Sequence, residues 1–588
     1  AYFLIVWDFV DWARQRGIPS NARGSGVGTM VGYVLGLSNA CPVHYGLLFE
    51  RFTDPDRAEY PDIDIDICQD GRADAIEYVR QKYGHVAQII TFGRLKAKAA
   101  IKDVARVMGF APSEGQRLSN LVPAELNITI DEALNKEPEL RQACEDDPRA
   151  TRVIDAARAL EDHARHAGVH AAGVIMATQP LDSIVPLCRV SGGDEAVTQW
   201  DGPTCERIGL LKMDFLGLRT LSTIERARQL VLDSIPEEAI WEAVGREKPE
   251  SSSGSSRLVH HPLDLERIPL DDQKVLGLFR RGETSAIFQF ESGGMRKLLV
   301  EMQPDRLEDL IAANALYRPG PMDLIPDYNA RKHGQQSVPK VHEIVDRYTE
   351  ETYGVMVYQE QVMQVLHGLG GIPLRQAYTV IKAISKKKMK VIDGARADFV
   401  SGAAERGVGE AQATELFDLI LKFAGYGFNK SHSTGYAIVA YQTAYLKTYF
   451  PAQYMAAVLT FESQAKKVED WAAYLEECRK VLRPCESPEA KRTGVEVRPP
   501  DVNHSGEDFS VEFDAGENES ADGGHIRFGL QAIKGIAKEA ISSIVQARED
   551  GGTFESIHDF CERIDQTFNV VKRFLLCEAF EASVVSFC

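Results

Sequence analysis

Residues 60–70 read YPDIDIDICQD and place Asp62, Asp64 and Asp66 at every second position, with isoleucines between them. Successive side chains of a strand point to opposite faces, so the three carboxylates share one face and the isoleucines fill the other. Like charges this close repel, and leaving them ionised without a partner in a partly buried site is costly. A divalent cation removes that cost. The alternative is the solvated face of an edge strand.

The size and composition of the chain predict a multidomain globular protein. With 588 residues it exceeds a single core, so we expect three or more domains. The apolar start, AYFLIVWDFVDWARQ, contains Asp8 and Asp11 and lacks a basic leader, which predicts a core helix and not a signal peptide or membrane span. Because the helical pattern is already under way at residue 1, we expect the chain to be cut from a longer protein.

Cysteine usage and net charge narrow the function classes. The 10 cysteines are scattered without any C-x-x-C pair, which favours reduced thiols in a cytoplasmic protein over a disulfide framework. A formal net charge of −19 argues against a protein that simply coats nucleic acid, for which a basic domain is expected. It remains compatible with an enzyme that has a locally basic channel.

The hydrophobic pattern divides the chain into segments. Residues 1–95 alternate helix and strand signals: an opening helix, the glycine-rich turn NARGSGVGTMVGYVLG, the aspartate strand, a helix near 71–84 and the strand AQIITFG. Residues 96–168 look helical and charged, and strand character returns in AAGVIMAT and GLLKMDFLGLRTL. A helical segment is therefore expected to interrupt a sheet domain whose halves lie apart in sequence.

The second half of the chain is predicted to be largely helical. The Ser/Gly-rich stretch 248–262 predicts a flexible loop, and residues 263–480 read as helices with short connections. VEVRPPDVNHSG, residues 495–506, marks a further boundary. After it, IRFGLQAIKGIAKEAISSIVQARE predicts a short strand and two helix-like runs hinged at KGI.

Two features carry candidate chemistry. Two-metal phosphoryl or nucleotidyl transfer needs carboxylates that converge on two cations, and Asp214, inside an apolar run, offers one more. Lys212, two residues earlier, shares its face and could neutralise it structurally, so both readings stay open. The glycine-rich turn leads into a predicted helix whose N-terminus would attract a phosphate, although it lacks the spacing of an ATPase loop.

A series of longer motifs carries a family resemblance. They are, in order, ARGSGVGTMVGYVLG, LLFERF, PDIDID, QIITFG, HAGVHAAGV, VTQWD, LLKMDFLGLRTL, FQFESGGM, YRPGPM, VYQEQVMQV and YGFNKSHSTGYAIVAYQTAYLK. Over nearly its entire length the chain resembles the C-family replicative DNA polymerases of bacteria, the DNA polymerase III α subunits.

The resemblance implies an α+β multidomain fold. It predicts a DNA polymerase β-like nucleotidyltransferase palm with an inserted helical thumb, large and mostly helical fingers, and a C-terminal tandem helix-hairpin-helix region. In this chain the palm would comprise residues 1–95 and 169–219, the thumb 96–168, the fingers 220–498 and the helix-hairpin-helix region 499–588.

The resemblance also implies a function and a metal site. The expected reaction is template-directed DNA synthesis, in which the primer 3′-hydroxyl attacks a dNTP with two Mg²⁺ ions bound and pyrophosphate leaves. Asp62, Asp64 and Asp214 match the metal ligands of the family, whereas Asp66 is expected to support them or to be structural. Spacing alone does not separate Asp66 from the other three.

Further positions correspond to nucleotide contacts of the family. Gly24, Ser25, Arg51, Lys212 and Lys430 should lie near the triphosphate, and Ser431 and His432 near the incoming sugar, where a bulky side chain could exclude a 2′-hydroxyl.

One departure from the family pattern concerns the fingers. The family usually reads R-R-A-M-G-K-K where this chain has IKAISKKK, so Ile381 and Lys382 stand at the place of two arginines. Lys382 can meet a phosphate but lacks the bidentate fork of arginine. We expect weaker or differently tuned nucleotide binding.

Several histidines and lysines offer further candidate contacts. His163, His166 and His170 have helical spacing, but packing and loop-orienting roles are favoured over a metal site. The run SKKKMK, residues 385–390, is either a solvated face or a contact to template or triphosphate. Lys534 and Lys538 are expected to grip DNA phosphates without reading bases.

Rival functions and partners complete the expectations. A metal-dependent nuclease using the same carboxylates and a DNA-binding or scaffolding relative with a dead site are the alternatives. Beyond primer–template DNA and dNTPs, a sliding clamp and other replisome subunits could bind through segments outside this chain. The family's PHP domain is expected before residue 1, and the last residues, EASVVSFC, do not resemble the family. We expect a cytoplasmic, nucleoid-associated protein without a membrane association.

Overall fold

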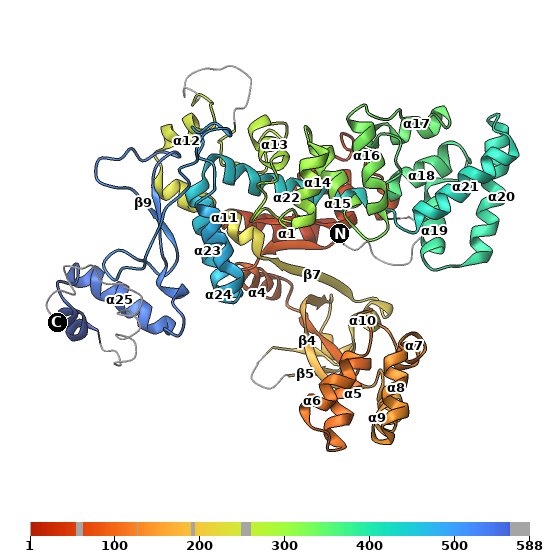
Figure 1. The fold of residues 1–588 in the computed structure, drawn as a ribbon, viewed down its shortest axis with the longest axis horizontal. Coiled ribbons are helices and arrows are strands. Elements are labelled where there is room, and N and C mark those ends of the chain that lie inside the picture. Colours follow the sequence, from red (N-terminus) through yellow and green to blue (C-terminus); the bar gives the residue numbers. More distant parts are fainter. Residues whose placement is uncertain (1, 54–62, 126, 190–194, 249–259, 565–588) are drawn as a thin grey trace. The chain divides into compact units, whose positions relative to one another are not determined.

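The computed structural model of the protein describes residues 2–53, 63–125, 127–189, 195–248 and 260–564 (Figure 1). The chain forms two compact units: unit 1 contains Ala1–Ala75 and Gly217–Cys588, and unit 2 contains Ile76–Leu216. The chain passes between them inside helix α4 (Arg72–Tyr83) and strand β7 (Leu211–Leu218). Helices predominate in both units and strands occur in both, as expected for a mixed α and β protein.

Unit 1 begins with the predicted core helix. Helix α1 (Tyr2–Gln15) buries Val6, Phe9, Val10 and Ala13, which recur at the spacing of one helix face. The next element, β1 (Ser20–Ala22), pairs antiparallel with β2 (Ile65–Cys68), so that Asn21 lies opposite Asp66.

The aspartate strand is shorter than the alternating pattern predicts. Strand β2 includes Asp66 but begins after Asp64, and Asp62 lies outside the described residues. Ile63, Ile65 and Ile67 are buried, which confirms that the isoleucines fill the inner face. Between β1 and β2 lie three short elements: η1 (Gly24–Gly28), α2 (Met30–Val34) and α3 (Phe49–Phe52).

The middle of unit 1 is helical, as predicted for residues 263–480. Its elements are α11 (Arg219–Ser234), α12 (Glu237–Ala243), α13 (Gln273–Arg280), α14 (Gly293–Met302), α15 (Leu307–Leu316), η3 (Pro321–Leu324), α16 (Ile325–Lys332), α17 (Glu343–Thr349), η4 (Glu350–Thr352), α18 (Gln359–Gly368), α19 (Leu374–Ser385), α20 (Met389–Glu405), α21 (Glu410–Ala424), α22 (Lys430–Tyr449), α23 (Pro451–Ala465) and α24 (Val468–Cys478). The predicted loop 248–262 falls mostly on residues that the structure does not describe. Helix α22 is buried along most of its length and packs against α13, α15 and α23 (Figure 1).

The C-terminal part of unit 1 contains a small sheet and a compact helical end. Strands β8 (Val497–Arg498), β10 (His525–Arg527) and β9 (Ser510–Glu512) pair in that order. They are followed by η5 (Leu530–Ala532), α25 (Lys538–Gly551) and α26 (Ile557–Arg563), which share a hydrophobic core. The short strand is confirmed, but the first predicted helix-like run is only the single turn η5. Gly535 in the hinge has a φ of +84°, a conformation that glycine adopts readily.

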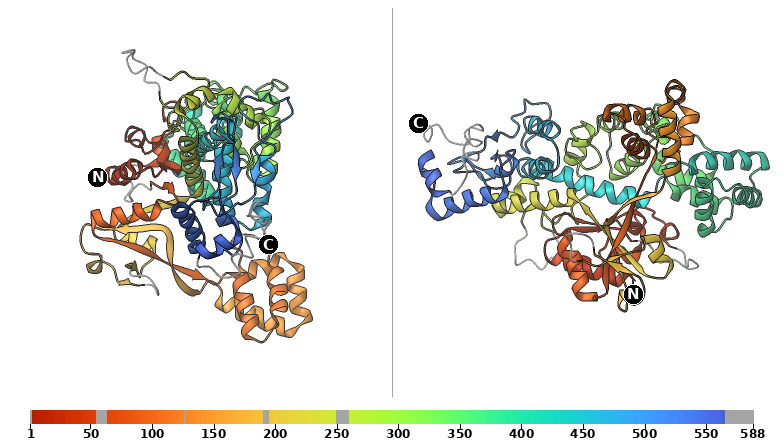
Figure 2. Two further views of the ribbon diagram at one scale, coloured as in Figure 1. Left: turned by 90° about the vertical axis from the view of Figure 1, so that its left-hand side faces the viewer. Right: turned by 90° about the horizontal axis from the view of Figure 1, so that it is seen from below.

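Unit 2 combines a sheet with a helical bundle. Its strands follow the order β7, β4 (Ala164–Met176), β3 (Val86–Arg94), β6 (Val197–Thr198) and β5 (Leu187–Cys188), and two short helical elements, η2 (Leu181–Ser183) and α10 (Gly202–Arg207), connect them. Between β3 and β4 the chain forms α5 (Ala97–Val107), α6 (Pro112–Asn120), α7 (Ile130–Lys136), α8 (Pro138–Asp146) and α9 (Pro148–Leu160). Figure 2 shows these five helices, in orange, as one bundle, and they bury a core of their own.

The helical spacing predicted for the three histidines is wrong. His166 and His170 lie in strand β4, and His163 immediately precedes it. Helix α9 ends at Leu160, and Asp162, with a φ of +63°, turns the chain into the strand. Pairing with β3 then holds this segment extended.

Two further observations concern the described residues as a whole. None of their helices is both long and apolar enough to span a membrane. Their cysteines are unbridged thiols, as the scattered spacing predicts.

Replacing Lys447 of α22 with methionine should destabilise unit 1. Its buried ammonium donates to Glu477 Oε1 at 2.6 Å and to the carbonyl oxygens of Glu283 and Ser285 at 2.8 and 2.9 Å. Lys447→Met removes the cation and leaves Glu477 unpaired, a cost on the order of 3–5 kcal/mol. Urea denaturation followed by circular dichroism measures the change. The exposed neighbour provides the control, because Lys480→Met should change stability by less than about 0.5 kcal/mol. Equal stability of the two variants would contradict the prediction.

Candidate active site

Asp64 lies beside the glycine-rich turn of unit 1. Its Oδ2 is 3.4 Å from Nη2 of Arg23, and its carbonyl oxygen accepts a hydrogen bond of 3.0 Å from the backbone N–H of Arg23. A Cβ on Gly24 would stand 3.8 Å from the same Oδ2. The start of η1 and the aspartate segment are thus held together, with one guanidinium facing the carboxylate.

Asp66 is buried behind this pair. Nε of Arg23 is 3.7 Å from its Oδ1, and the carboxyl group also interacts with Tyr436 of α22. Burial raises the pKa of Asp66 to about 7, and the nearby charge of Asp64 also raises it. The positive charge of Arg23 and the hydrogen bond with Tyr436 oppose this shift. A carboxyl group so enclosed is suited to connecting β2 with α22. Its expected supporting role stays a prediction.

Asp214 occupies strand β7 of unit 2 and is held by the lysine two residues before it. Lys212 Nζ lies 2.6 Å from Asp214 Oδ2, so the structural alternative of an internal ion pair is realised. The other oxygen, Oδ1, is buried and has no hydrogen-bond partner among the described residues. A carboxylate oxygen in that state fits a hard divalent cation such as Mg²⁺.

The meeting of the three predicted metal ligands is not described by the structure. Asp62 falls outside the described residues, and Asp64 and Asp214 belong to different units. Within the described ranges, no three or more His, Cys, Asp or Glu side chains form a group able to hold a metal ion. The trio therefore stays a prediction.

Two of the predicted phosphate contacts, Ser25 and Arg51, come together within unit 1. Ser25 Oγ, in η1, accepts hydrogen bonds from Arg51 Nη1 at 2.7 Å and from Asn429 Nδ2 at 3.1 Å. Arg51 also donates from Nε to Gln359 Oε1 at 2.8 Å. These bonds join η1, α3, the start of α18 and the residue before α22 into one polar cluster, which we call the Ser25 cluster.

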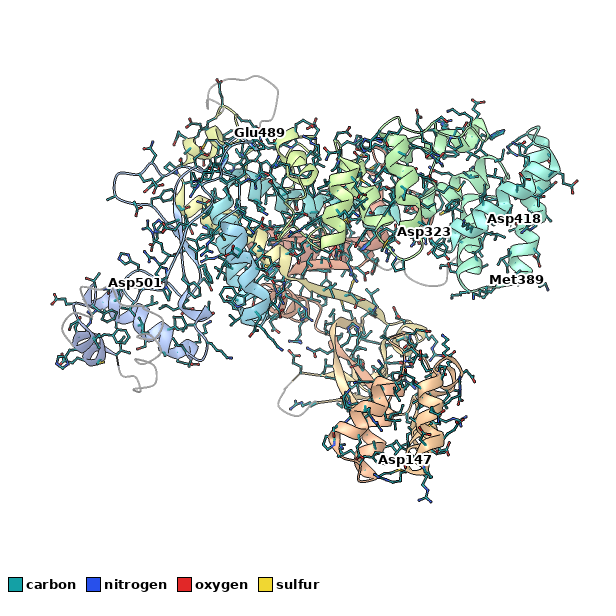
Figure 3. The ribbon with its side chains drawn as sticks, in the orientation of Figure 1. Asp147, Asp323, Met389, Asp418, Glu489 and Asp501 are labelled. Atoms are coloured by element: carbon teal, nitrogen blue, oxygen red, sulfur yellow. The ribbon has the colours of Figure 1, made fainter. Side chains whose placement is uncertain are left out.

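The two positions that replace the expected arginines lie in different surroundings. Ile381 is 1% exposed and belongs to the apolar core of α18–α21. Lys382 is exposed, and its Nζ lies 4.6 Å from the centre of the Tyr378 ring, which Arg51 also contacts at 4.8 Å. Only Lys382 borders the Ser25 cluster. The lysine-rich run 385–390 that follows is exposed, and Figure 3 labels Met389 in it.

Two acidic side chains of the protein itself bind the polar groups in the first turn of α22. Lys430 is buried, with its Nζ 2.8 Å from Glu351 Oε2. Glu360, fully buried in α18, accepts the backbone N–H groups of Lys430 at 2.9 Å and Ser431 at 3.5 Å. Burial raises the pKa of Glu360, and these N–H groups oppose the shift. Sequence reasoning missed both acids; Glu360 stands in the quoted motif VYQEQVMQV, where an acid among apolar residues was the available signal.

Ser431 and His432 lie where η1 meets α22. A Cβ on Gly28 would stand only 2.6 Å from Ser431 Oγ, so the glycine permits the close approach. The His432 ring packs against Tyr436 with centroids 4.2 Å apart. Burial lowers the pKa of His432 to about 4, and the charges of Arg23 and Arg318 add to the shift. His432 is therefore neutral near pH 7.

The predicted DNA contacts are accessible. Lys534 and Lys538 are both exposed, at the hinge and at the start of α25. The charge of Lys538 acts on Asp508, whose pKa is raised by burial.

Comparisons with known proteins agree with the family resemblance. Residues 1–217 match the model described as "Bacterial DNA polymerase III alpha NTPase domain", residues 253–407 match "Bacterial DNA polymerase III alpha subunit finger domain", and residues 494–585 match "Helix-hairpin-helix motif".

Curated relatives are similar over almost the whole chain. The DNA polymerase III subunit alpha of Thermus aquaticus is 43% identical over 96% of this chain and 43% of the relative. The Bacillus subtilis subunit is 40% identical over 96% of this chain and 46% of the relative, and that of Escherichia coli 39% over 99% and 47%. The chain thus spans less than half the length of these relatives. On these matches, the chain belongs to the bacterial DNA polymerase III α-subunit family.

Proposed function

We propose that this chain catalyses template-directed DNA synthesis in bacterial replication, adding dNTPs to a primer 3′-hydroxyl with release of pyrophosphate. The observation that carries the proposal is that one turn, η1, joins the Ser25 cluster to Asp64: Ser25 binds Arg51, and the preceding Gly24 lies against the carboxylate. Such an arrangement suits a triphosphate beside a metal-binding acid. In this proposal residues 1–95 and 169–219 form the palm, 96–168 the thumb, 220–498 the fingers and 499–588 the helix-hairpin-helix region.

The proposed metal ligands are Asp62, Asp64 and Asp214. Two Mg²⁺ ions held there would make the attacking hydroxyl more acidic and neutralise charge on the phosphates. The buried Oδ1 of Asp214, without a hydrogen-bond partner among the described residues, supports this assignment.

Two cations of the chain itself are placed to change partners. Arg23 lies beside Asp64 and Lys212 beside Asp214, so each pair is neutral without a metal. If the carboxylates held metal ions, the added positive charge would repel Arg23 and Lys212, and these side chains could then bind an anion instead. We assign Lys212 to a phosphate oxygen of the nucleotide.

The remaining nucleotide contacts follow from the Ser25 cluster and α22. Arg51 is pre-oriented by Ser25 and Gln359, and its fork suits phosphate oxygens. Lys382 adds a point charge next to it. Lys430 contributes only if it leaves Glu351, because its ammonium is bound there. Ser431 and His432 would border the sugar.

The proposed DNA contacts and partners extend beyond the reaction centre. Lys534 and Lys538 would hold primer–template phosphates without reading bases. A sliding clamp and other replisome subunits, bound through segments outside this chain, and a cytoplasmic, nucleoid-associated location belong to the same proposal.

Asparagine at the metal-binding positions should abolish synthesis but spare DNA binding. Asp62→Asn and Asp214→Asn each remove a carboxylate charge needed at the reaction centre, so primer extension should fall by about a thousandfold or more. Affinity for primer–template, measured by fluorescence anisotropy, should stay within about twofold. Asp66→Asn should retain far more activity than either.

The same assay separates the rival functions. A nuclease would degrade a labelled primer in Mg²⁺ alone, and a dead-site relative would neither extend it nor bind dNTP in a Mg²⁺-dependent manner. Unchanged extension by Asp214→Asn would refute the metal-site assignment.

Removing the His432 ring should weaken discrimination against ribonucleotides. His432→Ala opens space beside the proposed sugar position, so the ratio of kcat/KM for dNTP over rNTP should fall about tenfold. Because the ring has a pKa of about 4, well below its ordinary value, it is neutral above pH 6. The wild-type ratio should therefore be flat from pH 6 to 9 and change only as the pH falls toward 4. His558→Ala, exposed in α26, is the control. A ratio unaltered by His432→Ala would contradict the sugar assignment.

Restoring an arginine at position 382 should tighten nucleotide binding. In Lys382→Arg the side chain gains a bidentate fork at the edge of the Ser25 cluster, so KM for dNTP should fall about three- to tenfold with little change in kcat. Steady-state primer extension measures both constants. Lys480→Arg, at an exposed position after α24, should leave KM unchanged. If both variants behave alike, Lys382 does not meet the triphosphate.

A further inference from the structure

Strand β4 is irregular next to the candidate metal ligand Asp214. In its pairing with β3, Gln88 lies opposite Val174 and Ile90 opposite Val169. A single residue of β3, Ile89, therefore faces the four residues 170–173 of β4. This bulge takes backbone N–H groups of β4 out of the ladder, and they need other acceptors.

The side chain of His170 closes the bulge. Its Nδ1 accepts hydrogen bonds from the backbone N–H of Gly173 at 2.6 Å and of Ala172 at 3.2 Å. A ring nitrogen that accepts carries no proton, so the proton of the neutral ring resides on Nε2. One side chain thus satisfies two donors and fixes the local backbone.

The bulge ends directly opposite Asp214. Gly173 pairs with Asp214 in the β4–β7 ladder. A Cβ on Gly173 would stand 2.9 Å from Asp214 Oδ1 and 2.9 Å from His170 Nδ1. The carboxylate oxygen therefore lies over the bare glycine, a position that a side chain would take.

The same oxygen has no other anchor in the described part of the chain. Lys212 holds Oδ2 at 2.6 Å, while Oδ1 is buried and lacks a hydrogen-bond partner there. Oδ1 lies against Gly173, whose backbone N–H donates to His170 Nδ1.

We propose that His170 is a positioning residue for Asp214: it fixes the bulge so that Gly173 leaves room for Asp214 Oδ1 to point at a divalent cation. The inference rests on the proposed function, because it assigns Asp214 to metal binding. His170 acts through Asp214 and the backbone and does not itself touch the nucleotide.

Substitutions at 170 distinguish the acceptor from the ring. His170→Ala removes the acceptor, whereas in His170→Asn the side-chain oxygen stands close to the place of Nδ1 and can accept from the same N–H groups. His163→Ala is the matched control, because His163 is exposed just before the same strand. Gly173→Ala retains the His170 side chain but places a methyl group against Asp214 Oδ1, His170 Nδ1 and Ile89 Cδ1.

Metal binding is measured without turnover. Mn²⁺ is titrated by electron paramagnetic resonance into the full chain with a dideoxy-terminated primer–template and dNTP, and half-saturating Mg²⁺ is measured separately in primer extension. We expect the Mn²⁺ dissociation constant and the half-saturating Mg²⁺ concentration to rise about tenfold or more in His170→Ala and Gly173→Ala. Both quantities should return most of the way to the wild-type values in His170→Asn and should be unchanged in His163→Ala. Thermal melting verifies that each variant is folded.

Two outcomes would overturn the inference: Mn²⁺ affinity of wild-type strength in folded His170→Ala or Gly173→Ala, or a defect in His170→Asn as large as in His170→Ala. If the wild-type chain binds Mn²⁺ but does not extend a primer, the proposed function fails instead, and the Mn²⁺ affinities of the variants still decide the role of His170.

Discussion

Neutralisation of partly buried carboxylates is the constraint on which the candidate site depends. Asp64 and Asp66 lie within reach of one guanidinium, that of Arg23, and Asp214 binds the ammonium of Lys212. Without such partners, charges in partly buried strands would be strongly unfavourable. In this arrangement each carboxyl group has a cationic partner from the chain itself. It also means that any cation that binds must compete with an arginine and a lysine already in place.

The buried start of helix α22 also needs partners from within the protein. Its first turn is buried, so its N–H groups cannot rely on water, and Glu360 accepts two of them. An internal carboxylate thus occupies the place where a helix N-terminus could otherwise bind a phosphate. In the proposed function, positive charge toward the nucleotide must then come from side chains, and the geometry of Arg51 is fixed in advance by Ser25 and Gln359.

The sequence predicts elements better than it predicts partners. The apolar face of α1 and the helices of 263–480 follow from local periodicity, whereas the strand expected after residue 168 already begins at Ala164. The resemblance brought Ser25, Arg51 and Lys382 into one hypothesis. Periodicity failed at the histidines, because His166 and His170 satisfy a helical spacing although His166 pairs with Gly93 of β3 and His170 lies in the bulge of strand β4. The bonds of Lys430 to Glu351 and of Glu360 to the start of α22 span about 70 to 80 residues, and no local pattern encodes them.

The replaced arginine pair shows how the fold limits the meaning of a motif. Neighbouring residues of a helix point about 100° apart, so positions 381 and 382 of α19 face different surroundings. Ile381 belongs to the buried core of α18–α21, and Lys382 reaches the aromatic ring that Arg51 also contacts. An arginine at 381 would have to bury its guanidinium among apolar side chains or displace the helix. In this chain the residue at 381 is therefore a matter of packing, and under the proposed function only the residue at 382 can change how a nucleotide is held.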